Sequence, residues 1–318
     1  MTSKAEEIPR LKNLKIGGAP LVVRPLGREK FPHHSYRILI MGPTGAGKSS
    51  FVEAVAGPQS GIKISSGQLE GYTQEVTAYR IRGMTCNSRP IYLIDTPGFA
   101  DAKVSDFQIL TNVQQWVKDK NLLAVTKVLY IHPVTATRLP GSQKAVLSTF
   151  KALTGISSAR DITVVTSMWD TALGKPSLRR AQSNFTELKR EVWKDFLKDG
   201  ANITRFYNTH ASALRILDQV LSAHLERNMF QVFAVDISKV ELFRTPFGQN
   251  LEKDLINRIK TLKMKKTILE ADLDDPSTLE NEELASLLQT DLLETNQSLE
   301  RFMRQIREVC PPRAAKHK

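Results

Sequence analysis

The feature that most constrains the fold is a glycine-rich loop between an apolar run and an amphipathic segment. The loop reads Gly42-Pro43-Thr44-Gly45-Ala46-Gly47-Lys48-Ser49-Ser50. Its glycines allow the tight turns with which successive backbone N–H groups surround a phosphate, and Lys48 can reach the β- and γ-phosphates. The Ser49 hydroxyl can ligate Mg²⁺, and a helix that starts here adds its own anion-binding N-terminus. Residues 42–50 therefore predict a phosphate-binding P-loop.

A second motif supplies the partner that such a loop needs. It reads Ile91-Tyr92-Leu93-Ile94-Asp95-Thr96-Pro97-Gly98. An apolar strand that ends in Asp95 can hold Mg²⁺ through water, opposite Ser49, and Gly98 lets a backbone N–H approach the γ-phosphate. The last four residues alone fit an ordinary turn, but their pairing with a P-loop favours a site for Mg²⁺ and a nucleoside triphosphate.

A threonine between the two motifs is the expected third ligand of the metal. The segment 71–77 offers Thr73 and Thr77. A threonine from a mobile loop can complete the Mg²⁺ shell when triphosphate is bound and release it after hydrolysis. We favour Thr73, because Thr77 lies in an alternating stretch that is typical of a strand.

Strands and helices alternate from residue 36 to about 228, which indicates an α/β domain with a mostly parallel sheet covered by helices on both faces. The expected strands are residues 36–41, 75–82, 90–94, 126–131, 162–166 and 203–207. The expected helices are residues 48–56, 105–118, 142–153, 184–197 and 211–226.

The remaining segments divide into four parts. Residues 1–35 are rich in Pro, Gly and basic residues and predict an extended or mobile arm, in which residues 21–23 can dock as a short strand. Residues 229–248 form a connecting segment, and residues 311–318 are expected to be a disordered basic end. Between these, residues 249–310 carry apolar residues at three- and four-residue steps, interrupted at Asp274-Asp275-Pro276-Ser277, which predicts a hairpin of two long helices.

The hairpin has three interpretations. It is a cap on the core of the α/β domain, or a coiled coil for dimerisation or partner binding, or, through the short basic stretch 258–266, a membrane-surface helix. A membrane role for this stretch or for the basic arm has no further support in the sequence.

Composition limits the classes of partner and compartment. The chain has 318 residues, 45 Lys and Arg against 33 Asp and Glu, and a net charge of +12. The basic residues are interspersed with acidic ones, as on a solvated surface, and no aromatic-rich basic module predicts nucleic-acid binding. The sequence has only two cysteines, which favours a reducing compartment, and it has neither an apolar run of about 20 residues nor a recognisable signal peptide. We therefore expect a soluble cytoplasmic protein.

The motifs together resemble a known family. The chain is similar to AIG1/IMAP-type, septin-related GTPases, in particular to fungal AIG1-like proteins with helical tails. Besides the P-loop, the resemblance is carried by Gly71-Tyr72-Thr73-Gln74-Glu75-Val76, Asp95-Thr96-Pro97-Gly98-Phe99-Ala100-Asp101 and Val164-Val165-Thr166-Ser167-Met168-Trp169-Asp170. The resemblance covers about residues 36–228. It implies a G domain with a six-stranded sheet that has one antiparallel edge strand, GTP as ligand, Mg²⁺ as metal and, as in some relatives, nucleotide-dependent dimerisation. For this chain we expect a homodimer, if one forms, to use the G domain or the helical tail.

The base-recognition motif departs from the N/T-K-x-D pattern of guanine-specific sites. Thr166 takes its first place and Trp169 its last, or a shift by one puts Asp170 there; Lys is absent in both alignments. Trp169 can stack on a purine or serve as a packing residue. The resemblance adds Asn208 as a base contact. ATP or mixed nucleotide use therefore stays open.

The catalytic position also departs from the common pattern. Phe99 follows the Asp95–Gly98 motif where Ras-like proteins place the glutamine that orients water, so intrinsic hydrolysis should be slow. His132 and Arg138 can lie near the phosphates or a dimer partner, or be structural. Our leading hypothesis is a slow, Mg²⁺-dependent GTPase of switch or assembly type that converts GTP to GDP and phosphate with Lys48, Thr73 and Gly98. The alternatives are a promiscuous or ATP-using triphosphatase, and a nucleotide-gated assembly module without hydrolysis.

Overall fold

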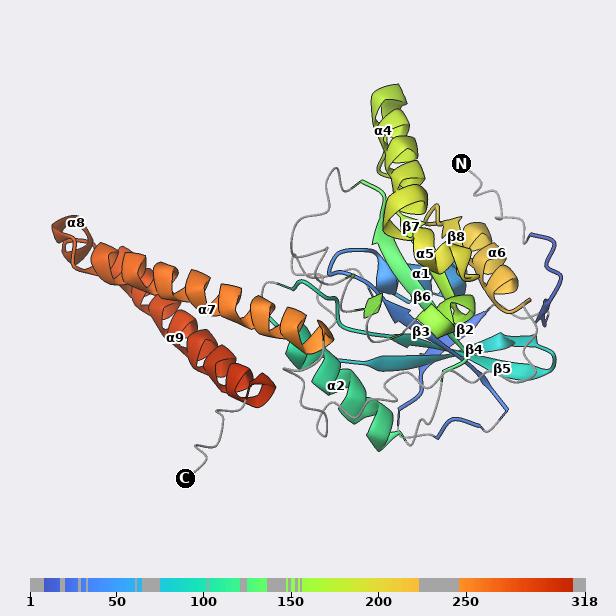
Figure 1. Ribbon diagram of the computed structural model, residues 1–318, viewed down its shortest axis with the longest axis horizontal. Coiled ribbons are helices and arrows are strands. Elements are labelled where there is room, and N and C mark those ends of the chain that lie inside the picture. Colours follow the sequence, from blue (N-terminus) through green and yellow to red (C-terminus); the bar gives the residue numbers. More distant parts are fainter. Residues whose placement is uncertain are drawn as a thin grey trace.

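The computed structural model describes most of the chain and shows a domain of mixed sheet and helices from which a helical hairpin extends (Figure 1). The described residues are 9–17, 21–27, 30–32, 34–60, 62–64, 75–101, 103–120, 125–135, 147, 150, 151, 154, 156–222 and 246–310. Thr73, Arg138, residues 229–245 of the connecting segment and residues 311–318, which the sequence analysis named, lie outside them.

The central sheet has the strand order β1-β4-β5-β3-β6-β7-β8, with β2 also paired to β4. The strands are β1 Leu14–Ile16, β2 Val22–Pro25, β3 Tyr36–Met41, β4 Thr77–Cys86, β5 Arg89–Asp95, β6 Lys127–Pro133, β7 Ile162–Ser167 and β8 Asn202–Arg205. From β5 to β8 all neighbours are parallel, and β4 runs antiparallel to β5, β1 and β2. Because parallel strands end at one edge, the P-loop after β3 and Asp95 at the end of β5 lie side by side.

The expectation of six strands was wrong, because two short segments of the N-terminal arm add to the antiparallel edge. Leu14 pairs with Cys86 and Val22 with Arg82, so that β1 and β2 follow each other along the ten-residue β4. The carboxylate of Asp218 accepts hydrogen bonds from the backbone N–H groups of residues 12–14 and fixes β1. The short strand expected at residues 21–23 is confirmed, whereas β1 is too short for a periodic signal.

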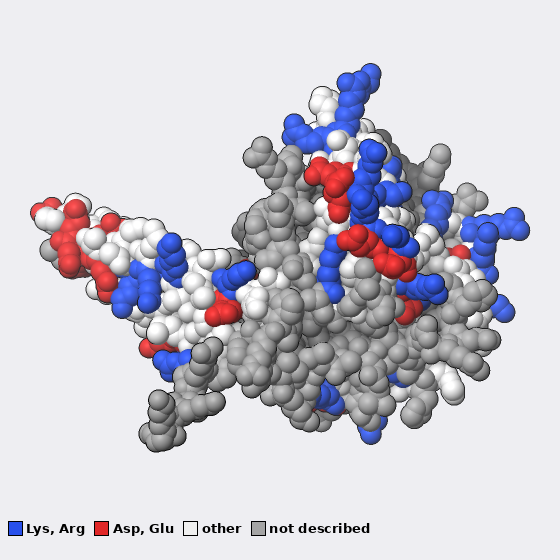
Figure 2. Space-filling model, viewed as in Figure 1, with Lys and Arg blue, Asp and Glu red and all other residues white. Residues whose placement is uncertain are grey.

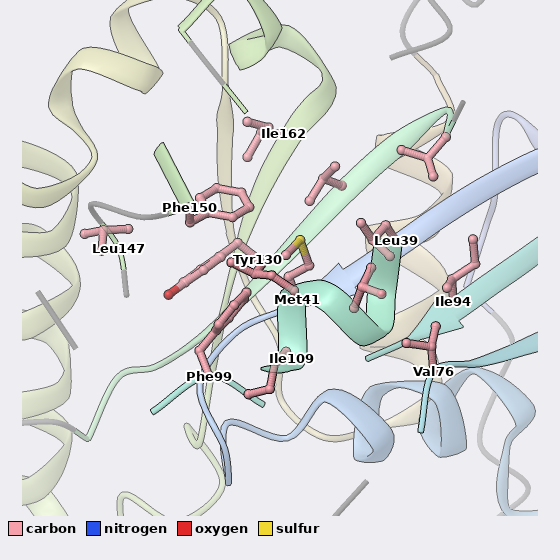
Figure 3. Packing of buried hydrophobic residues seen from close by; sticks show 14 of the residues in the cluster. Leu39, Met41, Val76, Ile94, Phe99, Ile109, Tyr130, Leu147, Phe150 and Ile162 are labelled. Atoms are coloured by element: carbon pink, nitrogen blue, oxygen red, sulfur yellow. The ribbon is translucent and has the colours of Figure 1, made fainter. Parts of the chain in front are cut away.

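Helices cover both faces of the sheet, as predicted. The helices of the domain are α1 Lys48–Ala56, α2 Asp106–Asp119, α4 Gly174–Glu187, α5 Lys194–Lys198 and α6 His210–Val220, joined by the short turns η1 Pro58–Ser60, η2 Ile156–Asp161 and η3 Leu188–Val192. One core cluster lies against α1 and α6. The other lies against α2 and includes Met41, Phe99, Tyr130 and Phe150 (Figure 3).

The boundaries of α1 and α2 follow the expectations to within one residue, whereas α6 ends at Val220 instead of the expected residue 226, and α4 differs most. Ser105 caps α2 by accepting from the N–H of Gln108. The described residues 147, 150 and 151 of the expected helix 142–153 are helical, and so is residue 154 just beyond it. The helix expected at 184–197 instead begins at Gly174 and is interrupted by the π-helical turn η3 before α5. Only Ala181 of α4 is buried, so its first turns carry no apolar face from which the sequence could have placed them.

The C-terminal region is the expected hairpin. It consists of α7 Pro246–Leu273, the short α8 Pro276–Leu279 and α9 Glu282–Val309, with Asp275 and Asn281 as N-caps of the last two. Leu251, Leu255 and Phe302 join the core cluster on the α2 side, so the base of the hairpin is a cap on the domain (Figure 1). No helix in the described ranges is long and apolar enough to cross a membrane.

Candidate functional site

The P-loop has a backbone path that only glycine permits at its start. Gly42 has a φ of +145°, and a Cβ there would lie 2.3 Å from the carbonyl oxygen of Ile131 on the neighbouring strand β6. Gly47, with a φ of +91°, is the N-cap of α1. The hydroxyl of Ser167, at the end of β7, donates to the carbonyl oxygen of Ala46 at 2.7 Å and braces the loop from the sheet. The loop therefore leads from β3 into the N-terminus of α1, where its backbone N–H groups can meet an anion.

Lys48 lies buried under the loop that it is expected to serve. Its Nζ donates to the carbonyl oxygen of Pro43 at 3.0 Å. Burial lowers the pKa of Lys48 to about 8, while the nearby Asp95 and Asp101 oppose the shift. A cation held in a desolvated loop is a strong attractor for phosphate oxygens.

Ser49 and Asp95 meet as the two motifs predicted. The Ser49 hydroxyl donates to Asp95 Oδ2 at 2.7 Å. Asp95 is fully buried, and among the described residues its Oδ1 has no hydrogen-bond partner. Burial raises the pKa of Asp95, opposed by Ser49 and Lys48. This carboxylate oxygen, which has no hydrogen-bond partner among the described residues, lies beside the Ser49 hydroxyl and the Lys48 ammonium group. Such an oxygen is a suitable ligand for a hard divalent cation such as Mg²⁺.

The segment after Asp95 is bonded directly to the P-loop. The N–H of Phe99 donates to the Gly42 carbonyl oxygen at 3.1 Å, and the N–H of Thr44 donates to the Phe99 carbonyl oxygen at 2.8 Å. A Cβ on Gly98 would lie 2.4 Å from the Cα of Thr44. The Thr44 hydroxyl also lies 3.1 Å from the Gly98 carbonyl oxygen and 3.2 Å from Asp101 Oδ2. Gly98 is thus placed against the loop, where only a residue without a side chain fits.

Two side chains considered for water activation are buried. Phe99 is 1% exposed and packs beside Met41 and Tyr130 (Figure 3). His132 is 4% exposed, pairs across the sheet with Thr166, and has no partner for Nδ1 within the described part of the chain. Burial lowers the pKa of His132 to about 4, so the imidazole is neutral at pH 7. These positions favour a structural role for His132.

At the base-recognition motif the structure separates packing residues from exposed ones. The indole N–H of Trp169 donates to Thr166 Oγ1 at 3.0 Å, and this hydroxyl donates to the carbonyl oxygen of Thr204 at 2.8 Å. Trp169 is 7% exposed and lies under the guanidinium of Arg205, 4.5 Å from the ring centroid. The side chains of Thr166 and Trp169 are therefore occupied within the protein, which favours the packing interpretation of Trp169 over stacking on a purine.

Asp170 and Asn208 lie at the surface and contact each other. The amide Nδ2 of Asn208 donates to Asp170 Oδ2 at 3.0 Å, and both side chains are exposed. Met168 and Asn208 have left-handed backbones, with φ of 63° and 55°. The structure thus joins two base-recognition candidates that come from the ends of different strands, a neighbourhood that sequence spacing alone does not reveal.

The same segment that meets the P-loop continues into contacts with the hairpin. Ser105 Oγ donates to Gln305 Oε1 at 2.6 Å, and Arg301 donates to the carbonyl oxygen of Lys103 at 2.8 Å. The N–H of Asp106 lies 3.4 Å from Asp254 Oδ2. Burial, and next the charge of Asp254, raise the pKa of Asp106 to about 7. Asp101 and Ser167 lie within the quoted motif segments but received no separate role there, and no motif spacing marks Ser105 or Asp106.

Comparison with known proteins supports the P-loop interpretation. Residues 37–166, less than half of the chain, match the family model described as 50S ribosome-binding GTPase. No curated protein matches the chain.

Solved structures give weaker likenesses. Toc33 from Arabidopsis thaliana in complex with GDP and Mg²⁺ shares 16% identity, over 63% of this chain and 88% of that chain, with a TM-score of 0.48. The LeoA bacterial dynamin GTPase from ETEC shares 14% identity, over 86% of this chain and 58% of that chain, with a TM-score of 0.40.

The strand order, the P-loop and the family match lead to one conclusion, which stops short of the narrower AIG1/IMAP assignment. The α/β domain of this chain has a P-loop at the edge of a mostly parallel sheet, its residues 37–166 match a GTPase family model, and a helical region follows it.

Proposed function

We propose that this protein binds Mg²⁺ and GTP at residues 42–50 and hydrolyses GTP slowly to GDP and phosphate. The observation that carries the proposal is the 2.7 Å hydrogen bond from Ser49 to Asp95 Oδ2. The second carboxylate oxygen of Asp95 is buried and has no hydrogen-bond partner among the described residues. A hydroxyl and a carboxylate beside a phosphate-binding loop form the donor set of a metal-triphosphate site. The match of residues 37–166 to a GTPase family supports guanine nucleotide as the ligand.

Different residues of this site would bind the phosphates, hold the metal ion and contact the γ-phosphate. Backbone N–H groups of the loop and Lys48 hold the phosphates and stabilise the negative charge that spreads over them in the transition state. Ser49 and Asp95 would hold Mg²⁺, with Thr73 as the expected third ligand. When bound, Mg²⁺ neutralises charge on the phosphate oxygens. Gly98 leaves its N–H close to the loop, where the γ-phosphate is expected.

The Lys48→Ala variant tests the phosphate site. We expect loss of nucleotide binding and of turnover, because the buried cation that attracts the phosphates is removed. Isothermal titration with GTP and Mg²⁺ measures the binding. Lys198→Ala, on an exposed position of α5, is the matched control and should bind like the parent protein. Unchanged turnover by a folded Lys48→Ala protein would refute the proposed site.

Guanine preference is proposed to rest on the Asp170–Asn208 pair. An exposed carboxylate at this position can accept from the guanine ring, and the amide of Asn208 orients it. Competition of GTP, ATP, CTP and UTP for one site decides between a GTPase and a promiscuous triphosphatase. We expect Asp170→Ala to reduce the preference for GTP over ATP and to leave binding of inorganic triphosphate unchanged.

The second candidate is a nucleotide-gated assembly module without hydrolysis. The burial of Phe99 favours it, because the side chain at the usual water-orienting position is apolar and 1% exposed. Single-turnover assays over a range of protein concentrations separate the candidates. Phosphate release that rises with concentration supports hydrolysis activated by self-association, whereas no release under any condition supports the module.

A further inference from the structure

The outer half of the hairpin carries an acidic end on a basic protein. No Lys or Arg occurs from residue 267 to residue 300, although the whole chain has a net charge of +12. The acidic residues of this stretch are Glu270, Asp272, Asp274, Asp275, Glu280, Glu282, Glu283, Asp291, Glu294 and Glu300. We call the residues 270–283 the acidic tip. Figure 2 shows this tip as the red end of the hairpin.

A basic segment lies next to the acidic tip on α7. It comprises Arg258, Lys260, Lys263, Lys265 and Lys266, which we call the basic band. Lys265 forms an ion pair with Asp291 at 3.4 Å, and Lys266 with Glu270 at 3.6 Å. Lys260 and Lys263 are exposed, and within the described ranges neither forms an ion pair. The charge along α7 therefore changes sign near residue 268, with unpaired charge on both sides.

Exposed apolar side chains lie where the sign changes. Met264 is 61% and Ile268 58% exposed on α7, and Leu287 is 63% exposed on α9. The base of the hairpin, in contrast, packs on the domain through Leu251, Leu255 and Phe302. An apolar patch between a basic and an acidic segment has the composition of a protein contact rather than of a solvated helix.

From this arrangement we infer that two copies of the chain associate through antiparallel outer hairpins. A two-fold axis near Ile268 brings each basic band against the acidic tip of the other copy, and it places Met264 and Ile268 of both copies at the centre. Parallel pairing would set like charge against like charge. With the axis at Ile268, α7 pairs with α7 of the other copy from Lys263 to Leu273, over about 15 Å at 1.5 Å per residue, and the part of α7 before Lys263 faces the acidic tip beyond Leu273. This association goes beyond the proposed nucleotide chemistry and requires no nucleotide.

Charge reversal of the full-length chain tests the inference. Sedimentation equilibrium at low salt should show a dimer that weakens as salt rises. The variant Lys260→Glu/Lys263→Glu should raise the dimer Kd at least about tenfold, and so should Asp274→Lys/Glu280→Lys, because several surface ion pairs are lost in each. Both sets of positions are exposed and leave the caps Asp275 and Asn281 intact. An equimolar mixture of the two variants should dimerise again.

Cysteine cross-linking tests the antiparallel arrangement, in a Cys310→Ser background. Ile268→Cys should form a disulfide-linked dimer, because the two copies of residue 268 lie near the axis. Lys253→Cys, exposed on the same helix, is the control and should not, because its two copies lie about 45 Å apart in this arrangement. Equal cross-linking at both positions would overturn the antiparallel arrangement.

Two further results would overturn the inference. One is a wild-type protein that stays monomeric at low salt up to about 100 μM, a concentration at which even a contact of about −6 kcal/mol is visible. The other is a dimer that forms only with triphosphate and survives both charge reversals, which would place the contact on the GTPase domain.

Discussion

At the scale of single residues, the candidate site depends on two positions, Asp95 and Gly98, where the gain or loss of a single atom would change the arrangement of the P-loop or of the metal ligands. Asp95 contributes one oxygen to Ser49 and retains a second one for the proposed metal. Gly98 contributes the absence of a side chain, because it lies against the backbone of Thr44. The spacing of motifs predicted both residues, whereas the contact between Asp170 and Asn208 was not predicted.

Replacement of Gly98 by alanine should disturb the site. The added Cβ would lie 2.4 Å from Thr44 Cα and 2.5 Å from its nitrogen, and neither backbone atom can move without displacing the P-loop. We expect a loss of stability of roughly 1–3 kcal/mol, measured by urea unfolding, together with weaker binding of triphosphate.

Gly17→Ala is the control for this change, because its new Cβ would meet nothing closer than 3.8 Å. A Gly98→Ala protein with the stability and affinity of this control would show that the close approach to Thr44 does not occur.

At the scale of elements, long-range hydrogen bonds hold segments that local propensity leaves undetermined. The strand β1 has three residues and is held by pairing with β4 and by the carboxylate of Asp218 in α6. Burial alone would raise the pKa of Asp218, but the bonds from three backbone N–H groups hold it below its usual value. The N-terminal arm therefore belongs to the sheet because of a residue some 200 positions away.

Removal of this anchor should release β1. In Asp218→Ala, the N–H groups of Lys12, Asn13 and Leu14 lose their acceptor, and we expect a loss of roughly 2 kcal/mol and faster amide exchange at residues 14–16. Since the carboxylate must be ionised, the loss should be largest above the ordinary pKa of Asp and vanish as pH falls through the depressed one.

The exposed Asp199→Ala provides the comparison on the surface. Amide exchange at residues 14–16 that remains slow in Asp218→Ala would assign the strand to pairing with β4 alone.

At the scale of the whole molecule, the described residues 98–101 and 103–106 contact the P-loop at one end and the hairpin at the other. They are bonded to Gly42 and Thr44 at one end and to Gln305, Arg301 and Asp254 at the other. If the conformation of this segment changes with the nucleotide state, the change will therefore alter the hydrogen bonds at the base of the hairpin. Asp106 lies at the junction and is buried next to Asp254, with Arg258 and Asp101 as further charged neighbours.

The junction should make stability depend on pH. The folded-state pKa of Asp106 is raised to about 7, so between about pH 4 and pH 7 the folded protein retains a proton that the unfolded chain has lost. The contribution of Asp106 to stability therefore decreases as pH rises through this window. Asp106→Asn, which keeps an acceptor for the Ala100 N–H, should remove the dependence and raise Tm at pH 8 by at least about 2 °C.

Thermal unfolding from pH 4 to pH 8 measures this effect, with the exposed Asp119→Asn on the same helix as the control. A Tm difference between Asp106→Asn and the parent protein that does not change with pH would contradict the assigned pKa.

The sequence by itself determined the P-loop, the Asp95–Gly98 motif, the alternation of strands and helices and the helical hairpin. Each is encoded in local spacing: glycines where the backbone must turn, an aspartate at a strand end, apolar residues at helical steps. Only the tertiary structure decided the two added strands, the early start of α4, the burial of Phe99, Trp169 and Thr166, and the meeting of Asp170 with Asn208. These features depend on which surfaces face each other across the fold, because packing and long-range hydrogen bonds, unlike periodicity, leave no regular pattern along the chain.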